Sequence, residues 1–219
     1  MRYEGYAKKI VDEISKNGQI RLLNMPELDL YMDQITTFMY EKLSIYKRDD
    51  KDKILTKTMI NNYTKHNIIP KPVNKKYSRD HLIILILVYH MKGVISIKDM
   101  KHLMAPLLEN YNSELEEKIK MEDIYSILHE IETDERERLD IKMKEDIDSV
   151  KEYLKEINLQ DDDILEIFTL IIMMAVRASI QKHLAEKLID EYFIRKDDII
   201  KKEKKKAKKK KLKNDELEE

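Results

Sequence analysis

Apolar side chains recur at helical spacing along most of this chain. After Pro26, at a helix-start position, they stand three or four residues apart at Leu28, Tyr31, Met32, Ile35, Phe38, Met39 and Leu43. Only three Gly and four Pro occur among 219 residues, and 39% of the residues are charged. The chain therefore has little turn material and many solvated positions. The pattern predicts an all-α protein built from long amphipathic helices.

Residues that begin or end helices punctuate the chain at Thr56, Asn67, Ser78, Gly93, Ser96 and Pro106. They predict helices over 57–66, 79–92 and 97–105, the last one stopped by the proline. Three longer charged helices are expected over about 113–131, 134–158 and 162–194.

Charge is segregated along the chain, although the net charge is only −1. Residues 51–102 hold eleven Lys or Arg against three Asp or Glu, and residues 109–166 hold eight against twenty-one. Residues 195–213 return to twelve against three. A basic block, an acidic block and a basic tail indicate different partners for different regions.

The predicted helix over 57–66 has two chemically different faces. At 100° per residue, one arc of about 140° carries only cations and small hydrogen-bonding groups, while Met59, Ile60 and Tyr63 gather on the other side. The polar arc consists of Lys57, Thr58, Asn61, Asn62 and Lys65. Asparagine can pair with the edge of adenine, and lysine reaches phosphate or guanine. The alternative is the wet side of an ordinary surface helix.

The next segment, PKPVNKKYSR, is basic and extended. Lys71, Lys75 and Lys76 have no acidic neighbour in it, and Tyr77 and Arg79 follow. Such a segment can flank a helix in a DNA groove and hold the sugar-phosphate backbone.

The order TMINNYTKHNIIPKP, KKYSRDHL and LILVYHMKGVISIKDMKHLM resembles the winged helix-turn-helix domain of MerR-type regulators. Matching positions are Ile60, Tyr63, Ile68, Ile69, Pro70, Tyr77, Ser78, Leu82, Gly93, Ser96, Ile97 and Met100. The segment PELDLYMDQITTFMYEKL adds a closer likeness to an uncharacterised bacterial family of unknown function with a MerR-like domain. Three features depart from the MerR pattern. About a dozen residues, 44–55, separate the first two helices, the wing is short, and the recognition helix has Asn61 where MerR-type proteins commonly carry arginine.

The resemblance implies a sequence-specific, double-stranded-DNA-binding regulator of transcription. In it, helix 57–66 enters the major groove and residues 71–79 form a wing on the backbone. We divide the chain into an N-terminal helix and loop (1–24), a MerR-like domain (25–106), a helical C-terminal domain (107–194) and a Lys-rich flexible tail (195–219). The alternative function is a protein-interaction module that docks partners through the helix-turn-helix and the acidic helices. Three roles are open for the tail: it binds DNA phosphates nonspecifically, it binds an acidic partner, or it increases solubility.

The apolar run over 164–180 is too short for a bilayer span, which needs about 20 residues. It predicts a helix buried on nearly all sides, either in a homodimer interface or in the core of a C-terminal bundle. The residues expected there are Ile164, Leu165, Phe168, Ile171, Ile172 and Met174.

The remaining expectations are negative. The chain has no Cys, which excludes disulfides and cysteine-ligated metal and agrees with a reducing cytoplasm, and its start lacks a signal-peptide core. No phosphate-binding loop, dinucleotide fingerprint, serine-nucleophile elbow or zinc-protease motif occurs. We therefore expect no enzyme, no cofactor, no metal and no membrane insertion, and the sequence identifies no small-molecule inducer.

Overall fold

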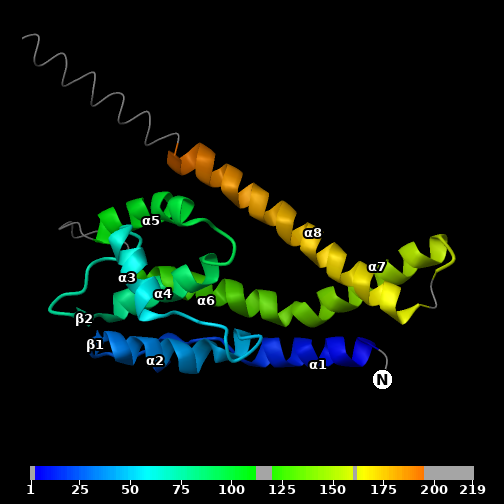
Figure 1. The fold of residues 1–219 in the computed structure, drawn as a ribbon, viewed down its shortest axis with the longest axis horizontal. Helices are drawn as coiled ribbons and strands as arrows, with labels where there is room; N and C mark the ends of the chain where they lie inside the picture. Colours follow the sequence, from blue (N-terminus) through cyan, green and yellow to red (C-terminus); the bar gives the residue numbers. More distant parts are fainter. Residues whose placement is uncertain (1–2, 112–119, 160–161, 195–219) are drawn as a thin grey trace, which may run out of the picture.

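The computed structural model describes residues 3–111, 120–159 and 162–194, and nearly all of its regular structure is helical (Figure 1). The elements are α1 (Tyr3–Lys16), η1 (Leu22–Asn24), β1 (Leu30–Tyr31), α2 (Met32–Leu43), η2 (Ser44–Tyr46), α3 (Lys57–Lys65), β2 (Lys76–Tyr77), α4 (Arg79–Met91), α5 (Ile97–Tyr111), α6 (Met121–Glu137), α7 (Leu139–Glu156), α8 (Asp163–Ile189) and the π-helical turn η3 (Asp190–Ile194). The all-α prediction is confirmed. Within the described ranges, none of the helices is both long and apolar enough to cross a membrane.

The first hydrophobic core surrounds α4. Its residues 82–86 are all buried, so neighbours cover this helix on every side rather than along one stripe. Those neighbours are α2, α3, α5 and the first half of α6, which contributes Met121 and Tyr125. The core thus reaches beyond residue 106, where we placed a domain boundary.

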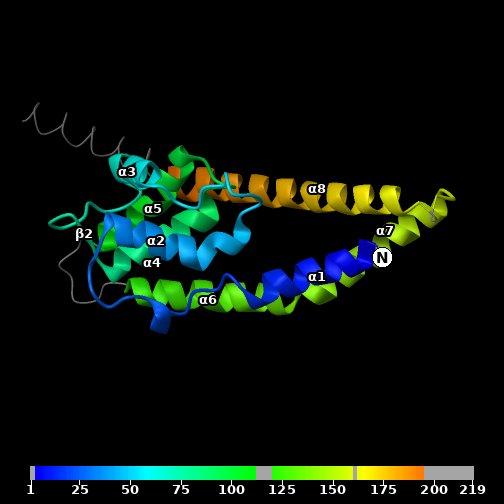
Figure 2. The same cartoon turned by 60° about the horizontal axis from the view of Figure 1, so that its bottom comes forward.

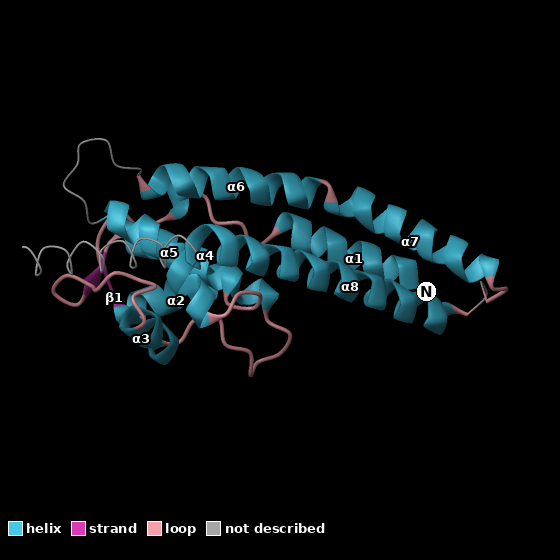
Figure 3. Cartoon of the chain, turned by 90° about the horizontal axis from the view of Figure 1, so that it is seen from above, coloured by secondary structure: helices cyan, strands magenta, loops and turns pink. Residues whose placement is uncertain are grey.

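A second, smaller core joins α1, α7 and α8 at the other end of the molecule. Tyr3, Val150 and Leu170 are buried in it. At its border the guanidinium of Arg177 on α8 donates to both carboxylate oxygens of Asp146 on α7, each at 2.8 Å. Figure 3 shows α6 and α7 running end to end along both cores.

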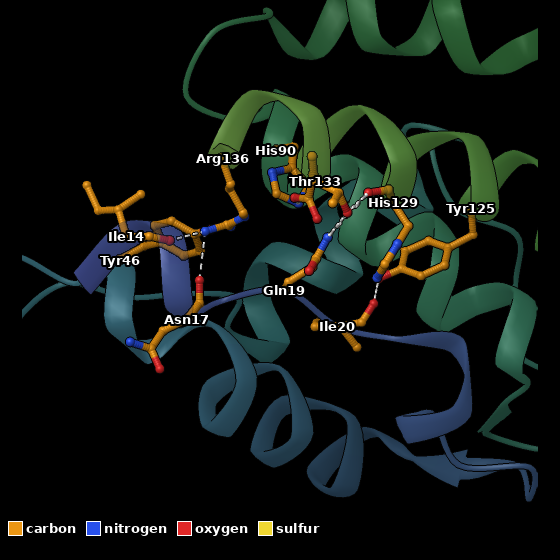
Figure 4. Close-up of polar contacts among 11 residues, drawn as sticks. Ile14, Asn17, Gln19, Ile20, Tyr46, His90, Tyr125, His129, Thr133 and Arg136 are labelled. Carbon is orange, nitrogen blue, oxygen red and sulfur yellow. Dashed lines mark hydrogen bonds and ion pairs between the residues drawn. The ribbon is translucent and has the colours of Figure 1, made fainter. Parts of the chain in front are cut away.

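The segment that follows α1 is bound to α6 through polar contacts between the two cores (Figure 4). The guanidinium of Arg136 donates to the carbonyls of Ile14 and Asn17 and to the hydroxyl of Tyr46. Further along, the Tyr125 hydroxyl donates to the carbonyl of Ile20 at 2.5 Å. The two bonds from Arg136 to Ile14 and Asn17 satisfy carbonyls that the end of α1 leaves without an intrahelical partner.

Several helix boundaries differ from the expected ones. The break expected between residues 131 and 134 lies at Arg138, so α6 ends at Glu137 and α7 begins at Leu139. The helix expected to start at Pro26 begins at Met32, because Leu30 and Tyr31 form β1 and pair antiparallel with Tyr77 and Lys76. The helix expected to stop at Pro106 continues to Tyr111. A proline in a helix removes one backbone donor, but Leu108 beyond it is buried in the first core, which favours continuation.

The apolar helix is not buried on nearly all sides within one chain. Ile164, Phe168, Ile171 and Ile172 are exposed. Leu165 and Met174 are half-buried against the second core. The Lys-rich tail over 195–219 lies outside the described residues.

Candidate nucleic-acid interface

Helix α3 is short and held to the first core by one side. Its N-cap is Thr56, whose hydroxyl accepts from the amide of Met59 at 3.2 Å, as predicted. Ile60 and Tyr63 are buried on the inner side. Asn67 has a φ of 56°, and the amide of Ile68 returns to the carbonyl of Tyr63, which ends the helix.

The outer side of α3 carries the polar side chains that the sequence placed there. Lys57, Thr58, Asn61 and Lys65 are exposed, and Asn62 is half-buried. Asp33 on α2 forms an ion pair with Lys57. Both side chains of this pair are well solvated, so the pair is weak and leaves Lys57 able to exchange to another anion.

The wing is a tight β-hairpin. Val73 and Lys76 exchange both backbone hydrogen bonds, at 3.0 and 2.9 Å, around a two-residue turn. The turn residues Asn74 and Lys75 have φ values of 51° and 62°, the left-handed signature of a type I′ turn. Lysine is disfavoured in that conformation. The turn therefore places the exposed ammonium of Lys75 at its tip although the backbone conformation there costs free energy. Figures 1 and 2 place this hairpin beside α3, at the end of the molecule opposite the N-terminus.

The lysines of the wing differ in their surroundings. Lys71 and Lys75 are exposed. Lys76 is half-buried, and its ammonium lies 5.5 Å from the centre of the Tyr31 ring, in range of a cation–π attraction. No Asp or Glu occurs from residue 53 to residue 79, although that stretch holds seven Lys or Arg. The segment that forms α3 and the wing therefore carries a net positive charge.

Two of the residues predicted to touch DNA have other roles. Tyr77 is buried in the first core, so its ring cannot reach a ligand at the surface. The guanidinium of Arg79 donates to the carbonyl of Leu22 at 2.7 Å and pairs with Glu122 at 3.0 Å. Both residues hold the base of the wing to the core. Their partners lie far away in the sequence, which is why the local pattern did not reveal these roles.

Sequence reasoning also missed the group that fastens the wing to α4. His81 is buried, and its Nδ1 accepts from the amide of Ser78 at 3.1 Å, closing a capping box at the start of α4. Its Nε2 lies 3.4 Å from the carbonyl oxygen of Lys71. Acceptance at Nδ1 places the proton on Nε2, so the neutral ring donates to the wing. The sequence signal was a histidine three residues after an N-cap serine.

His81 predicts a pH-dependent stability. Burial lowers the pKa of His81, and the Lys71 carbonyl, Asp80 and Asp29 oppose that shift only in part. A base with a lowered folded pKa contributes stability that is present above its unfolded pKa of about 6.5 and is lost as the pH falls below it, by at most about 1.4 kcal/mol per pH unit for one proton. Urea unfolding should therefore give a lower free energy of unfolding at pH 5.5 than at pH 7.5.

The matched variant is His81→Gln, because glutamine at this position keeps the capping box and does not titrate. Its difference in unfolding free energy between the two pH values should be smaller than that of the unaltered chain. An equal difference in both proteins would assign the pH effect to another group.

The part of the chain that contains α3 and the wing matches the model of a protein family. Residues 20–128 match a family described as a domain of unknown function, DUF1836. No curated protein and no solved structure matches the chain. The DUF1836 match begins at Ile20 and ends just after Tyr125, the two outermost buried residues of the first core. The matched region and the first core thus coincide, and α3 and the wing lie inside it. The match is consistent with an uncharacterised domain family and lends no support to the MerR resemblance.

Proposed function

We propose that the chain is a sequence-specific DNA-binding regulator of transcription, with a winged helix-turn-helix arrangement like that of MerR-type proteins. In this proposal α2 and α3 form the helix-turn-helix, α3 enters the major groove, and the 73–76 hairpin is the wing. The observation that carries the proposal is the outer side of α3, where exposed Lys57, Asn61 and Lys65 stand beside a hairpin with an exposed lysine at its tip.

The residues divide into two kinds of contact. Asn61 and Asn62 are the base-reading candidates, because an amide side chain can form two hydrogen bonds with adenine. Lys57, Thr58, Lys65, Lys71, Lys75 and Lys76 are the candidates for phosphate. Tyr77 and Arg79 position the wing and do not contact DNA in this proposal. The connector between α2 and α3 does not pull α3 away from α2, because Ile54 and Leu55 within it are buried in the first core.

The direct test is selection of bound fragments from random and genomic DNA by the full chain. The proposal expects enrichment of a short sequence and an affinity that falls as the salt concentration rises. Fragments without a shared sequence, together with salt-insensitive capture of a protein, would favour the interaction-module alternative.

Replacing Asn61 or Asn62 with alanine should weaken binding to the selected site by about 1–3 kcal/mol and leave binding to random DNA nearly unchanged. The reason is that a lost base contact affects only the sequence that it reads. Fluorescence anisotropy with both DNAs measures the two affinities. Asn17→Ala, an exposed asparagine after α1, is the matched control. Equal weakening on both DNAs would exclude base reading by these residues.

A further inference from the structure

A cleft lies between the wing and α5. Residues between Asn67 and Val73, which lead into the hairpin, form one wall, and the face of α5 that carries Lys101 and Ala105 forms the other. Figures 1 and 2 show α5 at the same end of the molecule as the wing. The volume of this wing–α5 cleft is about 570 Å³, which is a usual size for a small-molecule site. Of the residues proposed above to contact DNA, its lining includes Lys71 alone.

The walls of the wing–α5 cleft are apolar and held in place by the first core. Ile69 on the wing side and Leu108 on α5 are both buried in that core. Pro70 beside Ile69 has a φ fixed by its ring. Ala105 is half-buried, and its small side chain leaves room between the two walls. A ligand would not have to order these walls, so little of its binding free energy would be lost to ordering them.

His81 closes the inner end of the wing–α5 cleft. Its side chain is 3% exposed, and its bond to the carbonyl of Lys71 fixes the wing backbone against α4. Burial lowers the pKa of His81, so the ring is neutral at pH 7. An anion bound beside this ring would raise the pKa of His81. The histidine is therefore a built-in reporter of charge in the cleft.

Two lysines give the mouth of the wing–α5 cleft a positive charge. Lys71 on the wing side and Lys101 on α5 are exposed, and within the described ranges neither ammonium forms an ion pair. Glu109 also lines the cleft. It stands two turns further along α5 than Lys101, about 12 Å away along the helix axis. Two lysines against one glutamate leave the lining with a net charge of +1.

We propose that the wing–α5 cleft binds a small organic anion with an apolar body, of the aryl- or alkyl-carboxylate class. The carboxylate pairs with the ammonium groups of Lys71 and Lys101, and the body lies against Ile69, Pro70 and Ala105. Lysines without apolar walls would hold only a screened counterion, whereas apolar walls without lysines would favour a neutral ligand. This proposal does not rest on DNA binding, and its tests contain no DNA.

The first test follows the His81 ring by NMR in the full chain while sodium 3-phenylpropionate is added. The His81 signals should shift until the site is saturated, and the pKa of His81 should rise. The signals of the exposed His183 ring on α8 should not move. About 10 mM of this carboxylate nearly saturates a site with a Kd of about 1 mM, so the absence of a saturable shift with 3-phenylpropionate and with octanoate would overturn the proposal.

Two comparison compounds separate the charge of the ligand from its apolar body. 3-Phenylpropanamide has the same body without the charge and should bind at least about 10-fold more weakly, because hydrogen bonds to a charged group are the stronger ones. Inorganic phosphate has charge without an apolar body and should leave the His81 signals unchanged at the same concentration. If either compound binds as well as 3-phenylpropionate does, the proposed ligand class is wrong.

The second test alters the wing–α5 cleft itself. Ala105→Phe fills the space between the walls and should weaken carboxylate binding at least about 10-fold, because the ligand body loses its place against them. Ala175→Phe, at an exposed alanine of α8, is the matched control and should bind normally. If Ala105→Phe loses helical content, the lysine variants decide the question without it.

Lys101→Met removes one ammonium and keeps a long unbranched side chain. It should weaken binding of 3-phenylpropionate about 10-fold and leave binding of 3-phenylpropanamide unchanged. Lys98→Met, at an exposed lysine of the same helix outside the cleft, should change neither affinity. If Lys98→Met weakens carboxylate binding as much as Lys101→Met does, the anion is attracted by α5 in general and the cleft is not a site.

The third test asks whether the bound anion joins the wing to α5, since one of its two lysines belongs to each element. The amides of Val73 and Lys76, which bond across the hairpin, should exchange hydrogen more slowly in the presence of 3-phenylpropionate than in its absence. The amide of Asp52, which bonds within the connector, is the control and should not change. Unchanged exchange in the hairpin at saturating carboxylate would contradict the proposed place of the ligand against the wing.

Discussion

The variant K71A/K75G/K76A should bind DNA on the order of 100-fold more weakly near 0.15 M salt, with little change in sequence preference. Each lost phosphate contact removes about 0.9 from the slope of log affinity against log salt, so the three together should flatten it by about 2.7. Anisotropy titrations at several salt concentrations, with selected and random DNA, measure both quantities. Glycine is used at position 75 because the φ of 62° there would strain alanine as well.

Two controls separate charge at the wing from charge in general. The variant K8A/K9A/K16A removes three exposed lysines from α1, at the far end of the molecule, and should change the slope little. The variant K71R/K75R/K76R keeps the charge and should keep the slope. If the α1 variant flattens the slope as much as the wing variant does, DNA contacts the chain elsewhere.

Sequence reasoning succeeded where the determinants were local. Thr56 and Ser78 were predicted as N-caps, and both stand at helix starts. Asn67 was predicted to end the helix over 57–66, and its left-handed φ of 56° ends α3 there. Helical geometry alone also separated exposed Asn61 from buried Ile60. Each of these inferences depends on residues within one or two turns of each other.

The missed features depend on contacts between distant residues or on unusual turn chemistry. Leu30 pairs with Tyr77, and no pattern near Leu30 indicates that its backbone bonds are made there. The turn at Asn74 and Lys75 lacks the glycine that usually marks a type I′ hairpin. Burial of α8 was predicted from its apolar composition, but composition shows only that a surface needs cover and does not say which chain provides it.

The contacts of Arg136 predict the largest single-residue effect on folding. Arg136→Ala should lower the free energy of unfolding by about 2–3 kcal/mol, because three acceptors lose a charged donor. The donor's partners are the Ile14 carbonyl in α1, the Asn17 carbonyl just after α1, at 2.7 Å, and the Tyr46 hydroxyl in η2. The backbone at Gly18 also lies close to the Tyr46 side chain. A Cβ atom at Gly18 would lie only 2.7–2.8 Å from atoms of Tyr46. Removing the Arg136 guanidinium therefore weakens the contact of α6 with the end of α1 and with η2, between the two cores.

Urea unfolding of three variants resolves what the guanidinium contributes. Arg136→Lys keeps the charge but cannot bond both carbonyls and the Tyr46 hydroxyl at once, because an ammonium lacks the planar fork, so it should recover only part of the loss. Arg138→Ala, two residues on and exposed, should change the unfolding free energy by less than about 0.5 kcal/mol. Full recovery by Arg136→Lys would show that charge alone matters. In that case the bonds to Ile14 and Asn17 would not be what joins α1 to α6, and the two cores would depend on apolar contacts for their association.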